Sequence, residues 1–198
     1  MERDLSTALQ RAIEAGDQVL TAEVMPPRGA DPSHMLAMAA SLQGRVHAVN
    51  VTDGSRAVMR MSSLASCKLL LEAGLEPVLQ MACRDRNRIA LQADLLGAHA
   101  LGIRNLLCLT GDPVRAGDQA YARSVNEFES VKLLQQVDAL NRGGFGSRAG
   151  HPARWGDHAV CRVCRRPTIE ELERSPAPVA AQAGGGSPLR SNPDGDGP

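Results

Sequence analysis

The stretch PVLQMACRDRNRIALQADLLGAHALG, residues 77–102, decides the fold. It begins with a short apolar run typical of a buried strand, residues 77–82, and continues with a helical pattern over residues 86–100 that ends near Gly102. Another apolar run follows at residues 104–110. A strand, a helix and a second strand at this spacing predict a right-handed βαβ unit on a parallel sheet.

The same unit repeats toward the amino terminus, where strands are predicted at residues 19–25 and 46–52. Helices are predicted around these strands, namely a leading helix closed by Gly16, a helix from Asp31-Pro32 to about residue 42, and a helix through residues 64–71 that ends at Gly74. The predicted fold class is therefore α/β. It is either an open doubly-wound sheet or the first four βα units of a TIM-type (β/α)8 barrel.

A last helix is predicted after the fourth strand. It opens with Ser124-Val125-Asn126-Glu127, which has the pattern of a capping box. The apolar residues that follow recur at helical spacing and predict one buried face: Phe128, Val131, Leu134 and Val137.

Composition excludes several classes of protein. The 198 residues predict a single fold or part of one. Lysine plus arginine (22) equals aspartate plus glutamate (22), so no net charge attracts nucleic acid or anionic lipid. No apolar run is long enough to cross a bilayer, and the charged amino terminus lacks the apolar stretch of a signal peptide. Five irregularly spaced cysteines favour reduced thiols, so we expect a cytoplasmic protein.

The composition changes sharply at about Arg142. Ten of the 19 glycines and seven of the 12 prolines lie in residues 143–198. Such a segment cannot bury enough apolar surface to offset the entropy of ordering it. We therefore predict a domain over residues 1–142 and a disordered or non-native tail over residues 143–198.

Polar residues gather at the carboxyl ends of the predicted strands. Glu23 lies near the end of the first strand, Thr52 and Asp53 close the second, Gln80 lies in the third, and the fourth ends in Thr110-Gly111-Asp112. Catalytic and ligand-binding groups collect at this edge of parallel α/β folds. Because all four predicted strands carry polar residues at their carboxyl ends, we predict a functional site at that end of the sheet.

Several of these segments resemble the methylenetetrahydrofolate reductase family. The resemblance covers residues 18–142, in family order and spacing, and rests on four motifs: Ala22-Glu23-Val24-Met25-Pro26-Pro27-Arg28-Gly29, Val49-Asn50-Val51-Thr52-Asp53-Gly54, residues 80–88, and Cys108-Leu109-Thr110-Gly111-Asp112. It implies a (β/α)8 barrel that holds FAD and reduces 5,10-methylenetetrahydrofolate to 5-methyltetrahydrofolate, with NADH or NADPH as the donor. It also implies one-carbon and methionine metabolism.

The resemblance implies two catalytic residues. Glu23 matches the acid that protonates the departing folate nitrogen, a step suited to a carboxyl group with apolar neighbours. The structural alternative for Glu23 is a buried ion pair with an arginine. Asp112 matches the aspartate that stabilises the cationic iminium form of the substrate. The alternative for Asp112 is an N-cap of the turn that begins at Pro113.

The resemblance also implies contacts with the flavin. Thr52 matches a threonine that touches it, Gly111 permits close approach of the backbone, and Tyr121-Ala122 matches a pair that touches the cofactor. Gln80 and Thr110 are expected to face the flavin as well, although many relatives have histidine and arginine at these positions. These two departures affect the expected flavin potential and electron donor, and they are compatible with a branch that works with a partner reductase subunit. A homo-oligomer is the other expected assembly.

The tail departs from the family. If the codons of the tail are read one nucleotide out of frame, they can encode amino-acid sequences that resemble later parts of the family. We therefore expect the reading frame to change just after Arg142. The product as written is then expected to be poorly stable and to have little or no reductase activity. The tail also holds Cys161-Arg162-Val163-Cys164 near His151 and His158, but this spacing is unusual for zinc and we predict no metal site.

Two other functions stay open. One is a non-catalytic subunit or a folate- or pterin-binding module of the same fold. This alternative rests on Gln80 and Thr110, which stand where many relatives have histidine and arginine. The other is a small open α/β protein with an interaction tail.

Overall fold

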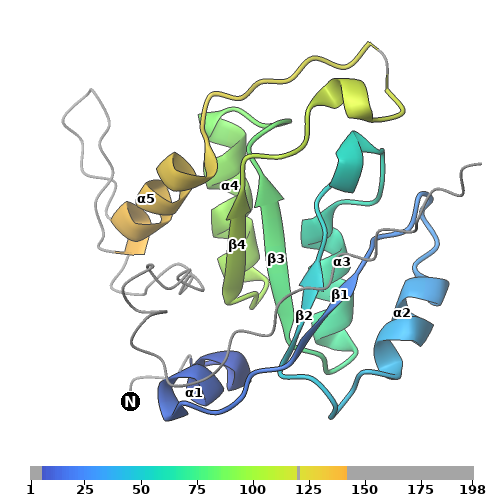
Figure 1. Cartoon of the computed structure of the whole chain (residues 1–198), viewed down its shortest axis with the longest axis vertical. Helices are drawn as coiled ribbons and strands as arrows, with labels where there is room; N and C mark the ends of the chain where they lie inside the picture. Colours follow the sequence, from blue (N-terminus) through green and yellow to red (C-terminus); the bar gives the residue numbers. More distant parts are fainter. Residues whose placement is uncertain (1–5, 120, 142–198) are drawn as a thin grey trace, which may run out of the picture. The chain divides into compact units, whose positions relative to one another are not determined.

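A computed structural model describes residues 6–119 and 121–141 of the chain. Its centre is a parallel four-stranded sheet in the order β1-β2-β3-β4 (Figure 1). The strands are Thr21–Val24, Ala48–Val51, Pro77–Ala82 and Asn105–Leu109. All four predicted strands are confirmed, the third to the residue. Each strand pairs with its neighbour in the chain, as in the first part of a TIM-type barrel, whereas a doubly-wound sheet reverses its strand order.

Helices alternate with these strands, as expected for an α/β fold. The α-helices are α1 (Ala8–Ala15), α2 (Ser33–Ala40), α3 (Ser63–Glu72), α4 (Arg88–Ala100) and α5 (Ser130–Asn141). Two short 3₁₀ helices, η1 (Ser55–Ala57) and η2 (Val114–Ala116), lie in the loops after β2 and β4. Among the described residues no helix is long and apolar enough to cross a membrane.

The helix-covered face of the sheet carries the main core. Register places Val24, Val51, Leu79 and Leu106 in one row across the four strands, and all four are buried. The row packs with buried residues of α2 to α5, among them Met35, Leu70, Leu91 and Leu133. Because side chains alternate along a strand, the next row, which contains Glu23, Asn50 and Val78, faces the other way. We call this opposite side the inner face.

Helix α1 covers the inner face where the strands begin. Leu9 packs against Ala48 and Val78 in a small second cluster. The Glu76 carboxylate accepts hydrogen bonds from the Ala8 and Leu9 N–H groups at 2.7 and 3.1 Å, so a residue at the start of β3 satisfies the amino terminus of α1. The other end of the inner face, toward the carboxyl ends of the strands, carries the predicted site.

The predicted start of the last helix is wrong. Residues 124–129 are not helical, and Asn126 has a positive φ of 42°. The Glu127 carboxylate does not close a capping box but accepts a hydrogen bond from the Arg88 N–H at the start of α4. Val131 is 63% exposed, so the predicted apolar face is also wrong, although Phe128 and Val137 are buried. Helix α5 begins instead at Ser130, whose N–H donates to the Thr110 hydroxyl.

The predictions about the tail fall outside the described residues. These are the boundary at Arg142, the disordered or non-native character of residues 143–198, and the Cys161-Arg162-Val163-Cys164 segment with its neighbouring histidines.

Candidate functional site at the carboxyl ends of the strands

Glu23 lies on the inner face of β1, beside Asn50 of β2. The two residues are partners in the parallel register, and Glu23 is exposed. In the described part of the chain its carboxylate has no hydrogen bond and no ion pair, so the alternative of a buried Arg pair is not what the structure shows. Glu23 is therefore on the side of the sheet away from helices α2 to α5, with a carboxylate that can meet a ligand.

Thr52 follows β2 and is 3% exposed. Its N–H donates to the Val24 carbonyl at 3.3 Å, which continues the pairing of β2 with β1 by one residue. Its hydroxyl oxygen is buried and has no hydrogen-bond partner within the described residues. A buried polar atom without a partner is uncommon in native proteins. This hydroxyl is therefore suited to bond a ligand.

Asp112 follows β4 and ties two loops together. One carboxylate oxygen, Oδ2, accepts a hydrogen bond from the Arg56 N–H at 2.6 Å. The following 3₁₀ helix η2 has no side-chain cap, so the alternative of an N-cap by Asp112 is wrong. Asp112 is exposed, and within the described residues no partner is recorded for its Oδ1. One oxygen therefore fixes the side chain while the other can face a cationic ligand.

Gly111 has a structural reason to be glycine. Its φ is +97°, and an added Cβ would lie 2.9 Å from the Arg84 Cβ and 3.3 Å from the Ala82 Cβ. The missing side chain thus makes room for β3 and Arg84. The predicted contact of Gly111 with the flavin stays a prediction, and the packing alone accounts for the glycine.

Gln80 and Thr110 do not share a face. Gln80 lies on the inner face of β3, two residues after Val78, and is 8% exposed. Thr110 follows Cys108, which packs with the helix-side core, and its hydroxyl accepts a hydrogen bond from Ser130 at 3.2 Å. The expectation that both side chains face one ligand is therefore not met, because Thr110 caps α5 instead.

Tyr121 and Ala122 lie in the loop between η2 and α5. Tyr121 is 99% exposed, and the Ala122 N–H donates to the Gln119 carbonyl in a turn. Within the described residues no hydrogen bond joins this pair to Glu23 or Thr52, and its contact with a cofactor stays a prediction.

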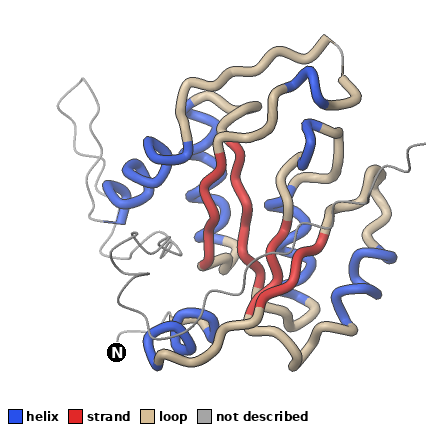
Figure 2. The backbone as a smooth tube through the Cα atoms, in the orientation of Figure 1, coloured by secondary structure: helices blue, strands red, loops and turns tan. Residues whose placement is uncertain are grey.

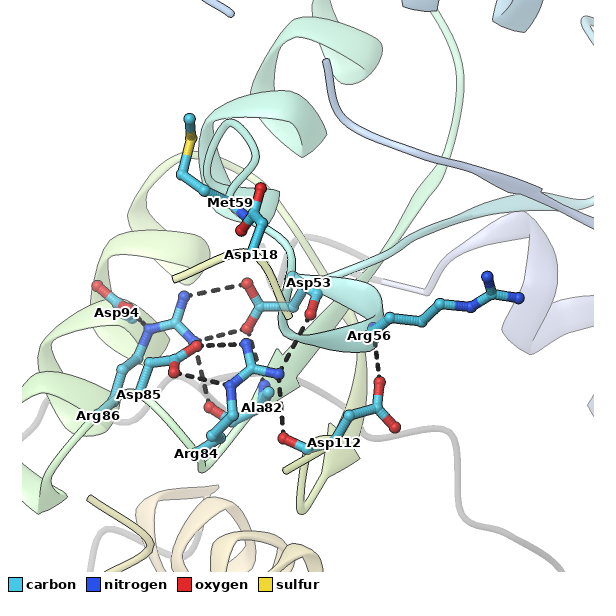
Figure 3. A network of polar contacts seen from close by, with 11 residues as sticks. Asp53, Arg56, Met59, Ala82, Arg84, Asp85, Arg86, Asp94, Asp112 and Asp118 are labelled. Atoms are coloured by element: carbon cyan, nitrogen blue, oxygen red, sulfur yellow. Dashed lines mark hydrogen bonds and ion pairs between the residues drawn. The ribbon is translucent and has the colours of Figure 1, made fainter. Parts of the chain in front are cut away.

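Sequence reasoning missed a network of arginines and aspartates just beyond the strands (Figure 3). The Arg86 guanidinium donates two hydrogen bonds to the Asp53 carboxylate, at 2.6 and 3.2 Å. It also forms an ion pair with Asp94 at 2.9 Å. Asp53 accepts a further bond from the Ala82 N–H at 2.8 Å, which ties the end of β2 to β3. Burial lowers the pKa of Arg86, and its bonds and Coulomb attraction to Asp53 more than offset this, so the pKa is raised.

Arg84 is the other missed cation and is more deeply buried, at 4% exposure. Its guanidinium forms a two-pronged pair with Asp85 at 2.7 and 2.6 Å, and this hydrogen bonding is the main reason that its pKa is raised. The signals for this network in the sequence were the run of charges at residues 84–88 and the placement of Asp53 and Asp112 at the ends of strands. Such a run is typical of a solvated loop, so the burial of Arg84 was not predictable from it.

The loops after β2 and β4 are joined at further points. Arg56 and Ala57 have positive φ values of 57° and 56°, which non-glycine residues rarely adopt. The Asp118 carboxylate accepts a bond from the Met59 N–H at 3.0 Å, and this bond lowers the pKa of Asp118. Figure 2 shows both loops leaving the same edge of the sheet. The strained backbone is thus held in place by contacts between the loops.

This edge of the sheet therefore offers three chemical functions. Glu23 supplies an exposed carboxylate, Thr52 a buried hydroxyl without a partner, and Asp112 a carboxylate with one oxygen fixed. Together they can bind a polar ligand, transfer a proton and stabilise positive charge.

Comparison with known families gives one match. The family model described as methylenetetrahydrofolate reductase matches residues 8–153. This range begins before the resemblance seen in the motifs and extends beyond Arg142. No individual curated protein is significantly similar to the chain.

Proposed function

We propose a function from the premise that this chain belongs to the methylenetetrahydrofolate reductase family, an oxidoreductase family of folate metabolism. The proposed reaction is the flavin-dependent reduction of 5,10-methylenetetrahydrofolate to 5-methyltetrahydrofolate, with NADH or NADPH as the donor. Family membership carries the proposal, and the observation that supports it at the site is the free carboxylate of Glu23 on the inner face.

Glu23 is proposed as the proton donor. When the five-membered ring of the substrate opens, the departing nitrogen needs a proton, and a carboxylic acid within hydrogen-bond reach can supply it. Glu23 is exposed and is not engaged with any described residue, so it can form that hydrogen bond without first breaking another.

Asp112 is proposed to stabilise the cation that ring opening produces. A fixed negative charge stabilises a developing positive charge without the cost of reorganising solvent. The bond from the Arg56 N–H fixes one oxygen of Asp112, and the other is the one that can face the iminium carbon.

The proposed cofactor is FAD, which when bound would relay hydride from the nicotinamide donor to the folate. The residues fit such a group in one respect that the structure shows, since the Thr52 hydroxyl is buried and has no protein partner. Gln80 lies on the same face and is proposed as a second contact. Thr110 caps α5 and is left out of the proposed site.

Turnover by this chain is proposed to be slow. A TIM-type barrel has eight strands and about 250 residues, whereas the described residues form a four-stranded sheet. Contacts that the remaining strands of such a barrel would make with the flavin and the folate do not come from the described residues. We therefore expect weak but measurable flavin binding and a low rate.

The test is a flavin titration followed by a single-turnover assay on the full chain. Purified protein is titrated with FAD while flavin fluorescence is followed, and the reduced complex is then mixed with 5,10-methylenetetrahydrofolate. We expect saturable flavin binding and formation of 5-methyltetrahydrofolate. A chain that binds folate but no flavin would instead support the non-catalytic binding module, and a chain that binds neither would remove both proposals.

The variant Glu23→Gln refines this test. It keeps the size of the side chain but removes the acid, so we expect unchanged flavin affinity and a rate of methyl product formation that falls by about 10²–10⁴-fold. A rate equal to that of the unmodified chain would show that Glu23 is not the proton donor.

A further inference from the structure

Arg84 is a buried cation that the proposed chemistry does not use. Its side chain is 5% exposed, while that of its partner Asp85 is 51% exposed, so the pair lies partly in the protein and partly at its surface. Asp85 occupies the Nε and Nη2 side of the guanidinium. The third nitrogen, Nη1, points toward the loops that follow β2 and β4 (Figure 3).

Arg84 bridges these two loops. Its Nη1 donates to the Gly54 carbonyl at 3.2 Å and to the Asp112 carbonyl at 3.4 Å. Its own carbonyl accepts a bond from the Val125 N–H at 2.7 Å, which attaches the segment before α5 to the same residue. The side chain of Arg84, which follows β3, thus contacts both the loop after β2 and the loop after β4.

The glycines around Arg84 show that the bridge is closely fitted. A Cβ added at Gly54 would lie 2.7 Å from Arg84 Nη2, and one added at Gly111 would lie 2.9 Å from the Arg84 Cβ. Both distances are too short for a real contact. Both glycines also have positive φ, at +55° and +97°. A Cβ at Gly54 would displace the flexible end of the Arg84 side chain, whereas a Cβ at Gly111 would press on the Cβ of Arg84 itself.

We propose that Arg84 is a positioning residue, which sets the place of the Asp112 carboxylate at the site. The inference rests on the proposed function. Asp112 is held at two points: its carbonyl by Arg84, and its carboxylate by the N–H of Arg56 in the loop that Arg84 also holds through Gly54. Without the guanidinium, both anchoring loops lose their common donor, and the Asp112 carboxylate moves relative to the bound folate.

The test is a double-mutant cycle on the full chain with Arg84→Met, Asp112→Asn and both together. Single-turnover rates at saturating flavin are measured together with the dissociation constant of FAD and the visible absorption spectrum of bound flavin. Arg84→Met is expected to lower the rate by about 10- to 100-fold, because small displacements of a catalytic group have effects of this size. It is also expected to shift the flavin spectrum.

The cycle separates positioning from a general structural role. If Arg84 acts through Asp112, Arg84→Met lowers the rate far less when Asp112 is already Asn, since the carboxylate to be positioned is gone. Equal losses in both backgrounds would overturn the inference. The matched control is Arg11→Met on α1, at the other end of the strands, whose guanidinium donates to the Ser6 carbonyl. This control is expected to leave rate and spectrum unchanged.

The outcomes also distinguish this inference from the proposed function. If the unmodified chain binds no flavin and forms no product, the proposed function fails. If it does both and the cycle is additive, only the role of Arg84 fails. Should Arg84→Met not fold, Arg84→Lys replaces it in the same cycle, because lysine keeps the charge and chain but cannot bond Asp85 and both loops at once. An additive cycle with lysine overturns the inference equally.

Discussion

At the scale of single residues, the site depends on polar atoms that the fold leaves without a partner. Glu23 and Thr52 both have such atoms, but they differ in burial, since Glu23 is exposed and Thr52 is 3% exposed. An exposed carboxylate is solvated in the free protein, whereas a buried hydroxyl without a protein partner carries a desolvation penalty that a hydrogen bond from a ligand relieves. Substitution of Thr52 is therefore expected to change ligand affinity more clearly than substitution of Glu23.

Replacement of Thr52 by valine should separate stability from binding. Valine has the same shape and removes the unpartnered hydroxyl, so we expect thermal stability without ligand to be unchanged or higher. If the hydroxyl bonds the flavin, the affinity for FAD falls by about tenfold, the effect of one lost hydrogen bond of about 1.4 kcal/mol. Thr52→Ser, which keeps the hydroxyl, is the control and should bind FAD like the unmodified chain. Equal affinity in Thr52→Val would show that this hydroxyl does not contact the cofactor.

At the scale of elements, the two loops at the carboxyl edge of the sheet act as one unit. Besides Arg84 and Asp112, they are joined through η1 and η2, where Gly117 packs against the backbone of Ala57. An added Cβ at Gly117 would lie 1.8 Å from the Ala57 carbonyl oxygen, so the contact is complete only with glycine. The strained backbone at Arg56 and Ala57 depends on this support.

Gly117→Ala is therefore expected to force the loops apart. Overpacking of this kind costs about 1–3 kcal/mol, and we expect a lower midpoint of thermal unfolding and faster proteolytic cleavage in the loop between η2 and α5. Gly29→Ala is the matched control, since an added Cβ there meets nothing within 4 Å and no positive φ is recorded. If both variants unfold at the same temperature as the unmodified chain, the loops are not coupled through Gly117.

At the scale of the whole molecule, the sheet formed by the described residues has two edge strands, β1 and β4. Within the described residues β1 and β4 each have one neighbouring strand, and unpaired edges of a parallel sheet favour aggregation. The family model matches residues 8–153 and no later part of the chain, and glycine and proline are concentrated after Arg142. The change in composition motivates the expectation that the coding frame changes just after Arg142, and this stays a prediction because the family match runs on to residue 153.

Sequencing of the coding DNA beyond the Arg142 codon checks this expectation. We expect that a shift of one nucleotide restores a family-like sequence with further strand and helix patterns. The polypeptide from the restored frame should bind FAD more tightly and turn over faster than the 198-residue chain, because closing a barrel removes both free edges. An intact frame with the same tail in several closely related strains would contradict it.

The amino-acid sequence by itself determined the alternation of strands and helices, since apolar runs and glycine or proline boundaries act locally. It also predicted that Glu23, Thr52 and Asp112 lie at one edge, because parallel strands place their carboxyl ends together. Only the tertiary structure decided that α5 begins at Ser130, that Thr110 caps it, and that Arg84 is buried between two loops. Each of these depends on hydrogen bonds between residues that are distant in the chain. Local sequence patterns carry no information about such bonds.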